Sequence, residues 1–217
     1  MTEPIPEISP ELRPDPADVS FDLERVLSSV VSIRTEVPGD AFTAETLGTK
    51  RRGHGVVIRE DGLVLTIGYL IVEAASVWLV DAGGQAIAGH VMGYDQETGF
   101  GLVQALDPTG LKPMAIGRSD DLREGDPVLF AGAGGADQAL KSEVVSKHEF
   151  AGYWEYLLDE AIFTSPPHPF WGGGALIGPD GTLRGIGSLF VQEAVPGGEP
   201  RDGNMVVPID LLKPILD

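Results

Sequence analysis

The chain has no cysteine, few basic residues and no long hydrophobic run. Without cysteine among its 217 residues, disulfides and thiolate metal sites are excluded. Only 15 lysines and arginines stand against 33 aspartates and glutamates, a net charge of −18 that repels nucleic acid and anionic lipid. No run approaches the roughly 18 consecutive apolar residues of a transmembrane helix. We therefore expect no nucleic-acid partner, no membrane insertion, no metal and no cofactor.

The N-terminal segment is acidic and rich in proline. Residues 1–22 hold six acidic residues and one arginine, and prolines stand at positions 4, 6, 10, 14 and 16. Without apolar periodicity, this composition predicts a disordered arm over residues 1–20. The segment also lacks the basic and apolar regions of a secretory signal. We expect a cytoplasmic protein, or a periplasmic one if the chain was trimmed from a longer precursor.

Glycine and proline are abundant, which predicts many short elements. The 29 glycines and 17 prolines make up about a fifth of the chain, where about 12% is usual. Alternating and β-branched segments predict twelve strands: 29–34, 55–59, 63–66, 76–80, 86–92, 101–105, 127–131, 141–148, 161–164, 174–178, 182–190 and 204–208. Short helices are predicted at 22–26 and 210–216. This pattern indicates an all-β sandwich or one or two barrels, and does not choose between them.

Three sequence blocks carry a resemblance to a known family. They read GHGVVI at 53–58 with DGLVLT at 61–66, GRSDDLREGDPVL at 117–129, and ALI at 175–177 with DGTLRGI at 180–186 and VPIDLLK at 207–213. Taken in order, they resemble trypsin-like serine proteases of the HtrA (Deg) type. The resemblance implies a trypsin-like domain over 21–217, with six-stranded antiparallel barrels at 21–115 and 116–217 and a closing helix. The PDZ domain usual in that family has no counterpart in this sequence.

The resemblance also locates the positions of a catalytic triad. Family members read N-P-G-N-S-G-G-P-L around the nucleophile, and HPFWGGGAL at 168–176 places Gly172 at the serine. LTIGYLI at 65–71 places Tyr69 at the general-base histidine. GYDQETGFGLV at 93–103 places Gly99 at the orienting aspartate. The resemblance therefore implies a degenerate protease without a nucleophile, because an acyl-enzyme needs one.

The loop around Gly172 differs from the family as well. Phe170 and Trp171 replace its Gly-Asn pair, and Gly173 and Gly174 complete the former oxyanion and nucleophile loop. Two large aromatics here are expected to crowd the oxyanion region or fill the specificity pocket, which removes the concavity that a small ligand needs. Partner contacts are then expected on the arm 1–20, the loops near 40–52 and the loop 193–203.

Other candidate residues allow more than one interpretation. His168 is a substitute base, a metal ligand or simply a hydrogen-bonded loop residue, and Ser165 is the hydroxyl nearest the old site along the chain. Tyr153 and Trp154, with Tyr156, form a partner-binding patch or ordinary core packing. The candidate binding residues are Tyr153, Trp154, His168, Phe170 and Trp171.

Three functions follow from these observations. The leading hypothesis is a catalytically inactive HtrA-type protease homologue that acts in protein binding, scaffolding or regulation. One alternative is a hydrolase or serine endopeptidase with relocated catalytic residues, and another is a regulatory subunit or inhibitor of a related active protease. The partner is expected to be a protein or peptide, and the acidic charge favours a basic one. The oligomeric state stays open.

Overall fold

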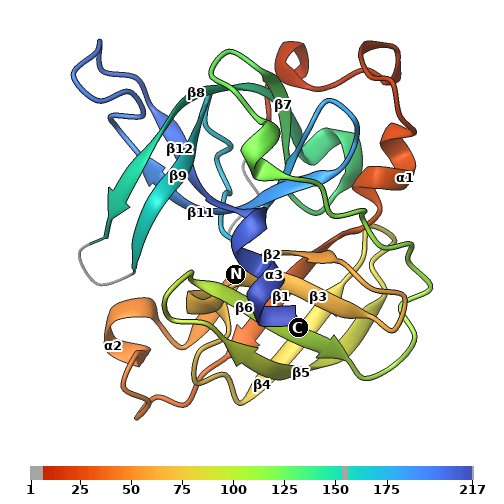
Figure 1. Cartoon of the computed structure of the whole chain (residues 1–217). Coiled ribbons are helices and arrows are strands. Elements are labelled where there is room, and N and C mark those ends of the chain that lie inside the picture. The colour runs from red at the N-terminus through yellow and green to blue at the C-terminus, as the bar shows by residue number, and fades with distance from the viewer. Residues whose placement is uncertain (1–6, 153–155, 217) are drawn as a thin grey trace.

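The computed structural model describes residues 7–152 and 156–216, whose strands form two closed six-stranded barrels. Strand order is β1-β2-β3-β6-β5-β4 in the first barrel and β10-β11-β12-β9-β8-β7 in the second, and neighbouring strands run antiparallel. Figure 1 shows the second barrel above the first. The strands are β1 (Val30–Glu36), β2 (Lys50–Val57), β3 (Leu63–Ile67), β4 (Ser76–Val80), β5 (Ala86–Tyr94), β6 (Phe100–Ala105), β7 (Pro127–Ala131), β8 (Ala139–Ala151), β9 (Leu157–Ser165), β10 (Ala175–Ile177), β11 (Leu183–Val191) and β12 (Gly203–Pro208).

The predicted all-β fold with two six-stranded barrels is confirmed. A strand lies at each of the twelve predicted segments, and β4 and β7 have the predicted bounds. The largest difference is β2, which begins five residues early at Lys50. Its second residue, Arg51, is buried and donates to the carbonyls of Gly48, Tyr69 and Val72. These tertiary hydrogen bonds allow a charged segment to continue the strand, which local pattern does not predict.

Helices are short and lie at the ends of the chain or between strands. The α-helices are α1 (Leu23–Leu27), α2 (Ala44–Leu47) and α3 (Lys213–Leu216), and the 3₁₀ helices are η1 (Pro10–Leu12), η2 (Pro16–Asp18), η3 (Gly68–Leu70), η4 (Ser119–Asp121), η5 (Gly135–Gln138) and η6 (Ile209–Leu212). Asp22 caps α1 by accepting from the Arg25 N–H at 3.0 Å. Within the described ranges, none of these helices has the length and apolar character needed to cross a membrane.

The two barrels share one hydrophobic core. A single cluster of buried side chains runs from the first barrel, with Ile33 and Leu65, into the second, with Leu129 and Ile186. A smaller cluster around Phe130 fills another part of the second barrel. Because the main cluster crosses the junction, the loops that meet there are held in place by both barrels.

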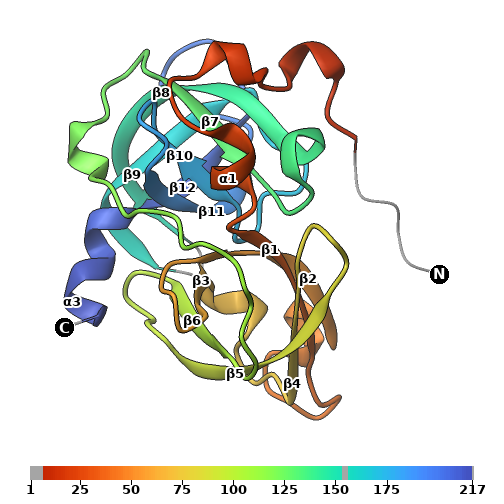
Figure 2. The same cartoon turned by 90° about the vertical axis from the view of Figure 1, so that its right-hand side faces the viewer.

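Of the arm predicted to be disordered over residues 1–20, the structure describes residues 7–20, and residues 1–6 lie outside the described part. Residues 7–20 lie along the second barrel in Figure 2, and Ile8 is only 3% exposed. Arg13 pairs with Asp137 at 2.6 Å, and the Asp18 carboxylate lies 3.5 Å from the Lys141 ammonium. Composition indicated disorder because prolines and acids dominate the segment. In the described part, prolines instead open both η1 and η2, and Ile8 and Pro14 are buried.

Candidate functional site

The three positions that the resemblance assigns to a catalytic triad meet at the junction of the barrels. Tyr69 lies in η3, Gly99 in the turn before β6, and Gly172 in the loop between β9 and β10. The Gly68 N–H donates to the Gly99 carbonyl at 2.7 Å. A Cβ built on Gly172 would lie 2.8 Å from the Tyr69 hydroxyl oxygen. The fold thus brings together three positions that carry no serine, histidine or aspartate.

Two tyrosines and a serine occupy the centre of this junction. The Tyr69 hydroxyl donates to the Ser188 carbonyl at 2.7 Å, and the Tyr156 hydroxyl shares a hydrogen bond with Ser188 Oγ. Ser188 is fully buried and lies at a register shift between Gly187 and Leu189, where β11 pairs with β12. A bulge re-aims a residue away from the regular ladder. The carbonyl and the hydroxyl of Ser188 therefore bond two tyrosines that come from different barrels.

The ring of Tyr156 fills the space where a side chain at position 99 would lie. A Cβ built on Gly99 would come within 2.2 Å of Tyr156 Cε1 and 2.7 Å of its Cδ1. Gly99 also has a φ of +81°, a conformation that L-residues with side chains rarely adopt. Glycine at this position thus permits both the turn and the tyrosine.

Beside the tyrosines, two buried histidines form hydrogen bonds to the backbone of the loop before Gly172. We call His54 and His168, with their backbone partners, the histidine clamp. His54 Nδ1 accepts from the Ala133 N–H at 3.0 Å, and its Nε2 donates to the Phe170 carbonyl at 3.0 Å. His168 Nδ1 accepts from the Phe170 N–H at 3.1 Å, and its Nε2 donates to the Gln138 carbonyl at 3.2 Å. One peptide unit on each side of Phe170 is therefore held by an imidazole.

The clamp requires both imidazoles to be neutral. Burial, helped by the neighbouring His168, lowers the pKa of His54 to about 3. Burial also lowers the pKa of His168 to about 4. The rings lie 6.2 Å apart between centroids, and His168 stacks on Phe130 at 5.3 Å. At neutral pH each ring has one donor and one acceptor nitrogen, which matches the backbone groups around it.

The glycine run after Trp171 has little room for side chains. A Cβ on Gly173 would lie 1.9 Å from the His54 carbonyl oxygen, and the φ of Gly173 is +77°. The Gly173 N–H donates to the Gly187 carbonyl, and the Gly174 N–H donates to the Trp171 carbonyl, both at 2.9 Å. These two backbone donors hold the loop and do not face a ligand.

The two loop aromatics pack against different barrels. Trp171 is half-buried, packs against the cluster around Phe130 and lies 5.7 Å from the Phe190 ring. Phe170 is also half-buried and makes an edge contact with His54, on β2 of the first barrel, at 4.5 Å between centroids. A concavity remains beside Tyr69.

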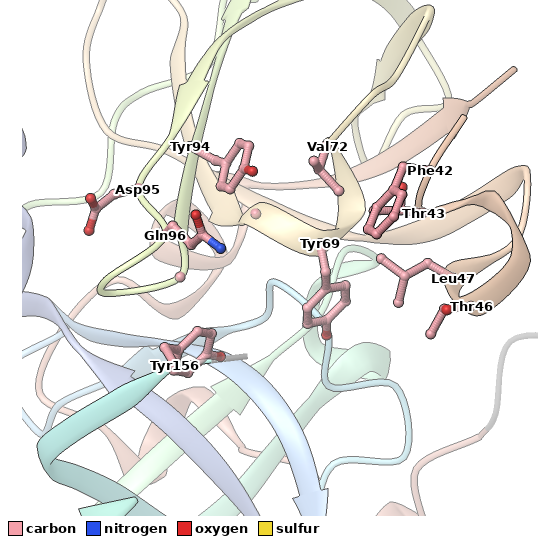
Figure 3. A pocket seen from close by; sticks show the side chains of 12 residues that line it. Phe42, Thr43, Thr46, Leu47, Tyr69, Val72, Tyr94, Asp95, Gln96 and Tyr156 are labelled. Carbon is pink, nitrogen blue, oxygen red and sulfur yellow. The ribbon is translucent and has the colours of Figure 1, made fainter. Parts of the chain in front are cut away.

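That concavity, which we call the aromatic pocket, has a volume of about 350 Å³. In Figure 3 the Gln96 side chain points into it from one side, between Tyr94 and Tyr156, while Tyr69 and Phe42 lie opposite. The predicted filling of the specificity pocket concerns Phe170 and Trp171, and neither residue lines this concavity. The pocket is lined by Phe42, Thr43, Thr46, Leu47, Gly68, Tyr69, Val72, Tyr94, Asp95, Gln96, Gly99 and Tyr156.

Comparison with known proteins identifies the family. Residues 53–186, more than half of the chain, match the family model described as trypsin-like peptidase domain. The chain belongs to the trypsin-like peptidase family. Its similarity to curated relatives lies within the HtrA-type branch. Serine protease PepD of Mycobacterium tuberculosis is 25% identical over 93% of this chain, and the periplasmic pH-dependent serine endoprotease DegQ of Escherichia coli is 30% identical over 81%. The chain spans 46% of PepD and 42% of DegQ, about half the length of each relative.

Solved structures of this branch have the same fold. The HtrA-type protease AlgW with a tripeptide superposes with a TM-score of 0.69 over 89% of this chain and 60% of that one. AlgW with a decapeptide gives a TM-score of 0.68 over 89% and 65%. Their sequence identities to this chain are 20% and 19%, so these matches establish the fold and nothing finer.

In a trypsin-like peptidase, the oxyanion is stabilised by the N–H groups of the nucleophile and of the residue two positions earlier. With Gly172 at the nucleophile position, the earlier residue is Phe170. Its N–H donates to His168 Nδ1. A donor that is directed at a buried imidazole does not stabilise negative charge that develops in the cleft.

The candidate binding residues have different outcomes. His168 is fully buried, and both of its ring nitrogens bond backbone groups. Phe170 and Trp171 are half-buried and keep only part of a surface. Tyr153 and Trp154 lie outside the described residues.

The other catalytic and metal candidates are not assembled. Ser165 Oγ donates to the Asp202 carbonyl at 2.8 Å and accepts from Arg201 Nε at 3.1 Å, so its bonds are to the 201–202 loop and not to a histidine. His148 stacks on Phe163 at 4.0 Å, and burial lowers its pKa. Among residues 7–152 and 156–216, no three histidine or carboxylate side chains come close enough to hold a metal ion.

Three residues of the site escaped sequence reasoning. Ser188, and not Ser165, contributes the hydroxyl at the junction, and it lies one residue beyond the serine-free stretch 166–187. His54 lies within the GHGVVI block without any local sign of a role in the site, and the sequence identifies Tyr156 only as part of an aromatic group. Their sequence separations from Gly99 and Gly172 leave no local signal, so only the closing of the barrels brings them together.

Proposed function

We propose that this chain is a catalytically inactive member of the trypsin-like peptidase family that acts by binding another protein. The observation that carries the proposal is Gly172. It stands at the position that the family resemblance assigns to the nucleophile, and the space before it holds the Tyr69 hydroxyl. A residue without a side chain cannot form an acyl-enzyme.

The residues at the two supporting positions strengthen the proposal. Tyr69, at the general-base position, already donates its hydroxyl proton to the Ser188 carbonyl. A phenol that donates in this way does not act as a general base, because that role needs an acceptor such as a neutral imidazole. At the aspartate position the side chain is absent and Tyr156 fills the space. Any substitution that restores the triad must also displace this ring.

Among the described residues, neither Ser188 nor Ser165 has a histidine as a hydrogen-bond partner. Ser188 is fully buried and its Oγ bonds the Tyr156 hydroxyl, whereas Ser165 bonds a carbonyl and an arginine. Ser146 Oγ does lie 3.2 Å from His148 Nδ1, but this serine is buried and its hydroxyl donates to a backbone carbonyl. Activation of a serine needs a free acceptor such as a neutral imidazole, and a substrate must reach the serine. Both barrels are closed, so the fold supports binding without hydrolysis.

The direct test is labelling with a fluorophosphonate probe together with a casein-cleavage assay. We expect neither labelling nor cleavage, while an active trypsin-like protease treated in parallel is labelled stoichiometrically. Stoichiometric labelling of any serine, located by peptide mass spectrometry, would overturn the proposal. Mapping to Ser165 or Ser188 would instead support a relocated nucleophile.

A further inference from the structure

The segments that line the aromatic pocket carry charge of one sign. Residues 38–48, 68–74 and 94–99 contain five carboxylates and no lysine or arginine: Asp40, Glu45, Glu73, Asp95 and Glu97. Hydrogen bonds from Thr43 and Phe42 lower the pKa of Glu73, so it is ionised at neutral pH. Arg51 approaches these segments but is buried and donates to three carbonyls and to Thr43 Oγ1. Asp95 is the carboxylate that lines the pocket, and the three segments around it are negative as a set.

The inner wall of the pocket is aromatic and aliphatic. Four lining side chains are phenylalanine or tyrosine, and Leu47 and Val72 add aliphatic surface. Ring faces carry partial negative charge and attract cations. The polar group that Figure 3 shows inside the pocket is the amide of Gln96, whose carbonyl oxygen can accept a hydrogen bond. Walls of this kind suit an apolar stem that ends in a cation.

Phe42 stands at the pocket mouth in a loop that is firmly held. Its side chain is 93% exposed, although its N–H donates to Glu73 Oε1 at 3.0 Å. The next residue, Thr43, bonds Glu73 Oε2 through its N–H at 2.7 Å and its hydroxyl at 2.6 Å. Glu73 itself has a φ of +59°, unusual for a residue with a side chain. Strained backbone and an ordered, exposed aromatic are features of binding surfaces.

We propose that the aromatic pocket binds an arginine side chain of an extended segment of a partner protein. The methylene stem lies against the apolar wall, the planar guanidinium stacks on the rings and donates to Gln96, and Asp95 with the acidic segments around the pocket attracts its charge. The net charge of −18 steers a basic segment toward the protein. This inference deepens the proposed function, because it takes the pocket as a binding site and not as a reaction centre.

The test is a titration of the ¹⁵N-labelled full chain with the peptide acetyl-Ala-Ala-Arg-Ala-Ala-amide. The same peptide with citrulline, an uncharged isostere of arginine, is the matched control. We expect amide shifts at Phe42, Gln96 and Gly99, and affinity for the arginine peptide about 10-fold tighter than for the citrulline peptide. Raising the salt from about 50 to about 500 mM should weaken binding several-fold.

Two pairs of variants sharpen the result. Phe42→Ala should weaken binding of the arginine peptide about 5-fold, whereas Trp78→Ala, at an exposed aromatic on β4, should not. Glu97→Lys should weaken binding, whereas Glu60→Lys should do so less. Glu60 precedes β3, and the pairing of β3 with β6 puts it at the opposite end of β6 from Gly99.

Several outcomes would overturn the inference. They are equal affinity for the arginine and citrulline peptides, shifts confined to another surface, no shifts at millimolar peptide, or unchanged binding by Phe42→Ala. The fluorophosphonate test distinguishes this failure from failure of the proposed function. A chain that binds no arginine peptide and also resists the probe is still inactive, whereas labelling contradicts the inactive state whatever the peptide does.

Discussion

The histidine clamp and the aromatic pocket both adjoin Gly172, yet they are built in opposite ways. On the clamp side, the backbone N–H of His54 donates to the Gly172 carbonyl at 2.8 Å. Both imidazoles are buried, and their ring nitrogens bond backbone groups. On the pocket side, Tyr69 borders an open volume with a fully exposed phenylalanine at its mouth. One side of Gly172 is thus buried structure, while the other side borders an open concavity.

The comparison predicts that two neighbouring glycines differ greatly in how well they tolerate replacement by alanine. Gly173→Ala should destabilise the fold by on the order of 3 kcal/mol or more, because its Cβ would overlap the His54 carbonyl at a positive φ. Gly172→Ala should have a much smaller effect, because its Cβ meets only the end of the Tyr69 side chain. Urea denaturation of the two variants measures the difference. Equal stability of the two would contradict the structure of this loop.

The clamp also predicts loss of stability on mild acidification. The pKa values of His54 and His168 are about 3 and about 4 in the folded state, below the unfolded value of about 6.5. As the pH falls below about 6.5, the unfolded chain gains protons that the folded chain excludes. The stability contribution is complete above that pH and declines toward the folded pKa values, by up to about 1.4 kcal/mol per pH unit for each histidine.

This decline is measured by urea denaturation between about pH 7 and pH 4.5. His168→Gln keeps hydrogen-bonding groups but does not titrate. The slope of unfolding free energy against pH should therefore fall by the contribution of one histidine. His90→Gln, at an exposed position on β5, is the matched control and should leave the slope unchanged. An unaltered slope in His168→Gln would show that the clamp does not exclude protons.

On the pocket side, removal of one hydroxyl should have a moderate effect. Tyr69→Phe leaves the buried Ser188 carbonyl without its 2.7 Å hydrogen bond and should destabilise the fold by about 1–2 kcal/mol. Tyr94→Phe, at a half-exposed ring of the same pocket, should change stability by less than about 0.5 kcal/mol. Thermal unfolding of both variants provides the measurement. A larger loss for Tyr94→Phe would reverse our assignment of the structural tyrosine.

The smallest expected effect is on activity. Gly172→Ser alone should restore no proteolysis, because triad residues act as a unit and Tyr69 is not a base at neutral pH. Adding Tyr69→His and Gly99→Asp should still fail, since an aspartate at position 99 meets the Tyr156 ring. Fluorophosphonate labelling of each variant measures this, and circular dichroism confirms that it is folded. Labelling of the single Gly172→Ser variant would show that the junction still contains a competent base.

Prediction from sequence succeeded where the signal was local. Strand alternation and turn residues located all twelve strands, and the sequence blocks placed Tyr69, Gly99 and Gly172 at one site. It failed for the N-terminal segment, because Ile8 and Arg13 acquire their partners only from the second barrel. It also failed for β2, where a buried arginine continues the strand through distant carbonyls.

Residue identity and short-range pattern were enough to predict the family resemblance and the twelve strands, and the sequence shows no serine, histidine or aspartate at the three assigned positions. They could not predict which side chains occupy the junction, because that depends on how the two barrels fold together. Tyr156 and Ser188 meet at the junction, His54 clamps Phe170, and a pocket stays open beside Tyr69. The physical reason is that two barrels bring together side chains more than 30 residues apart in the chain, and no local periodicity encodes which of them meet.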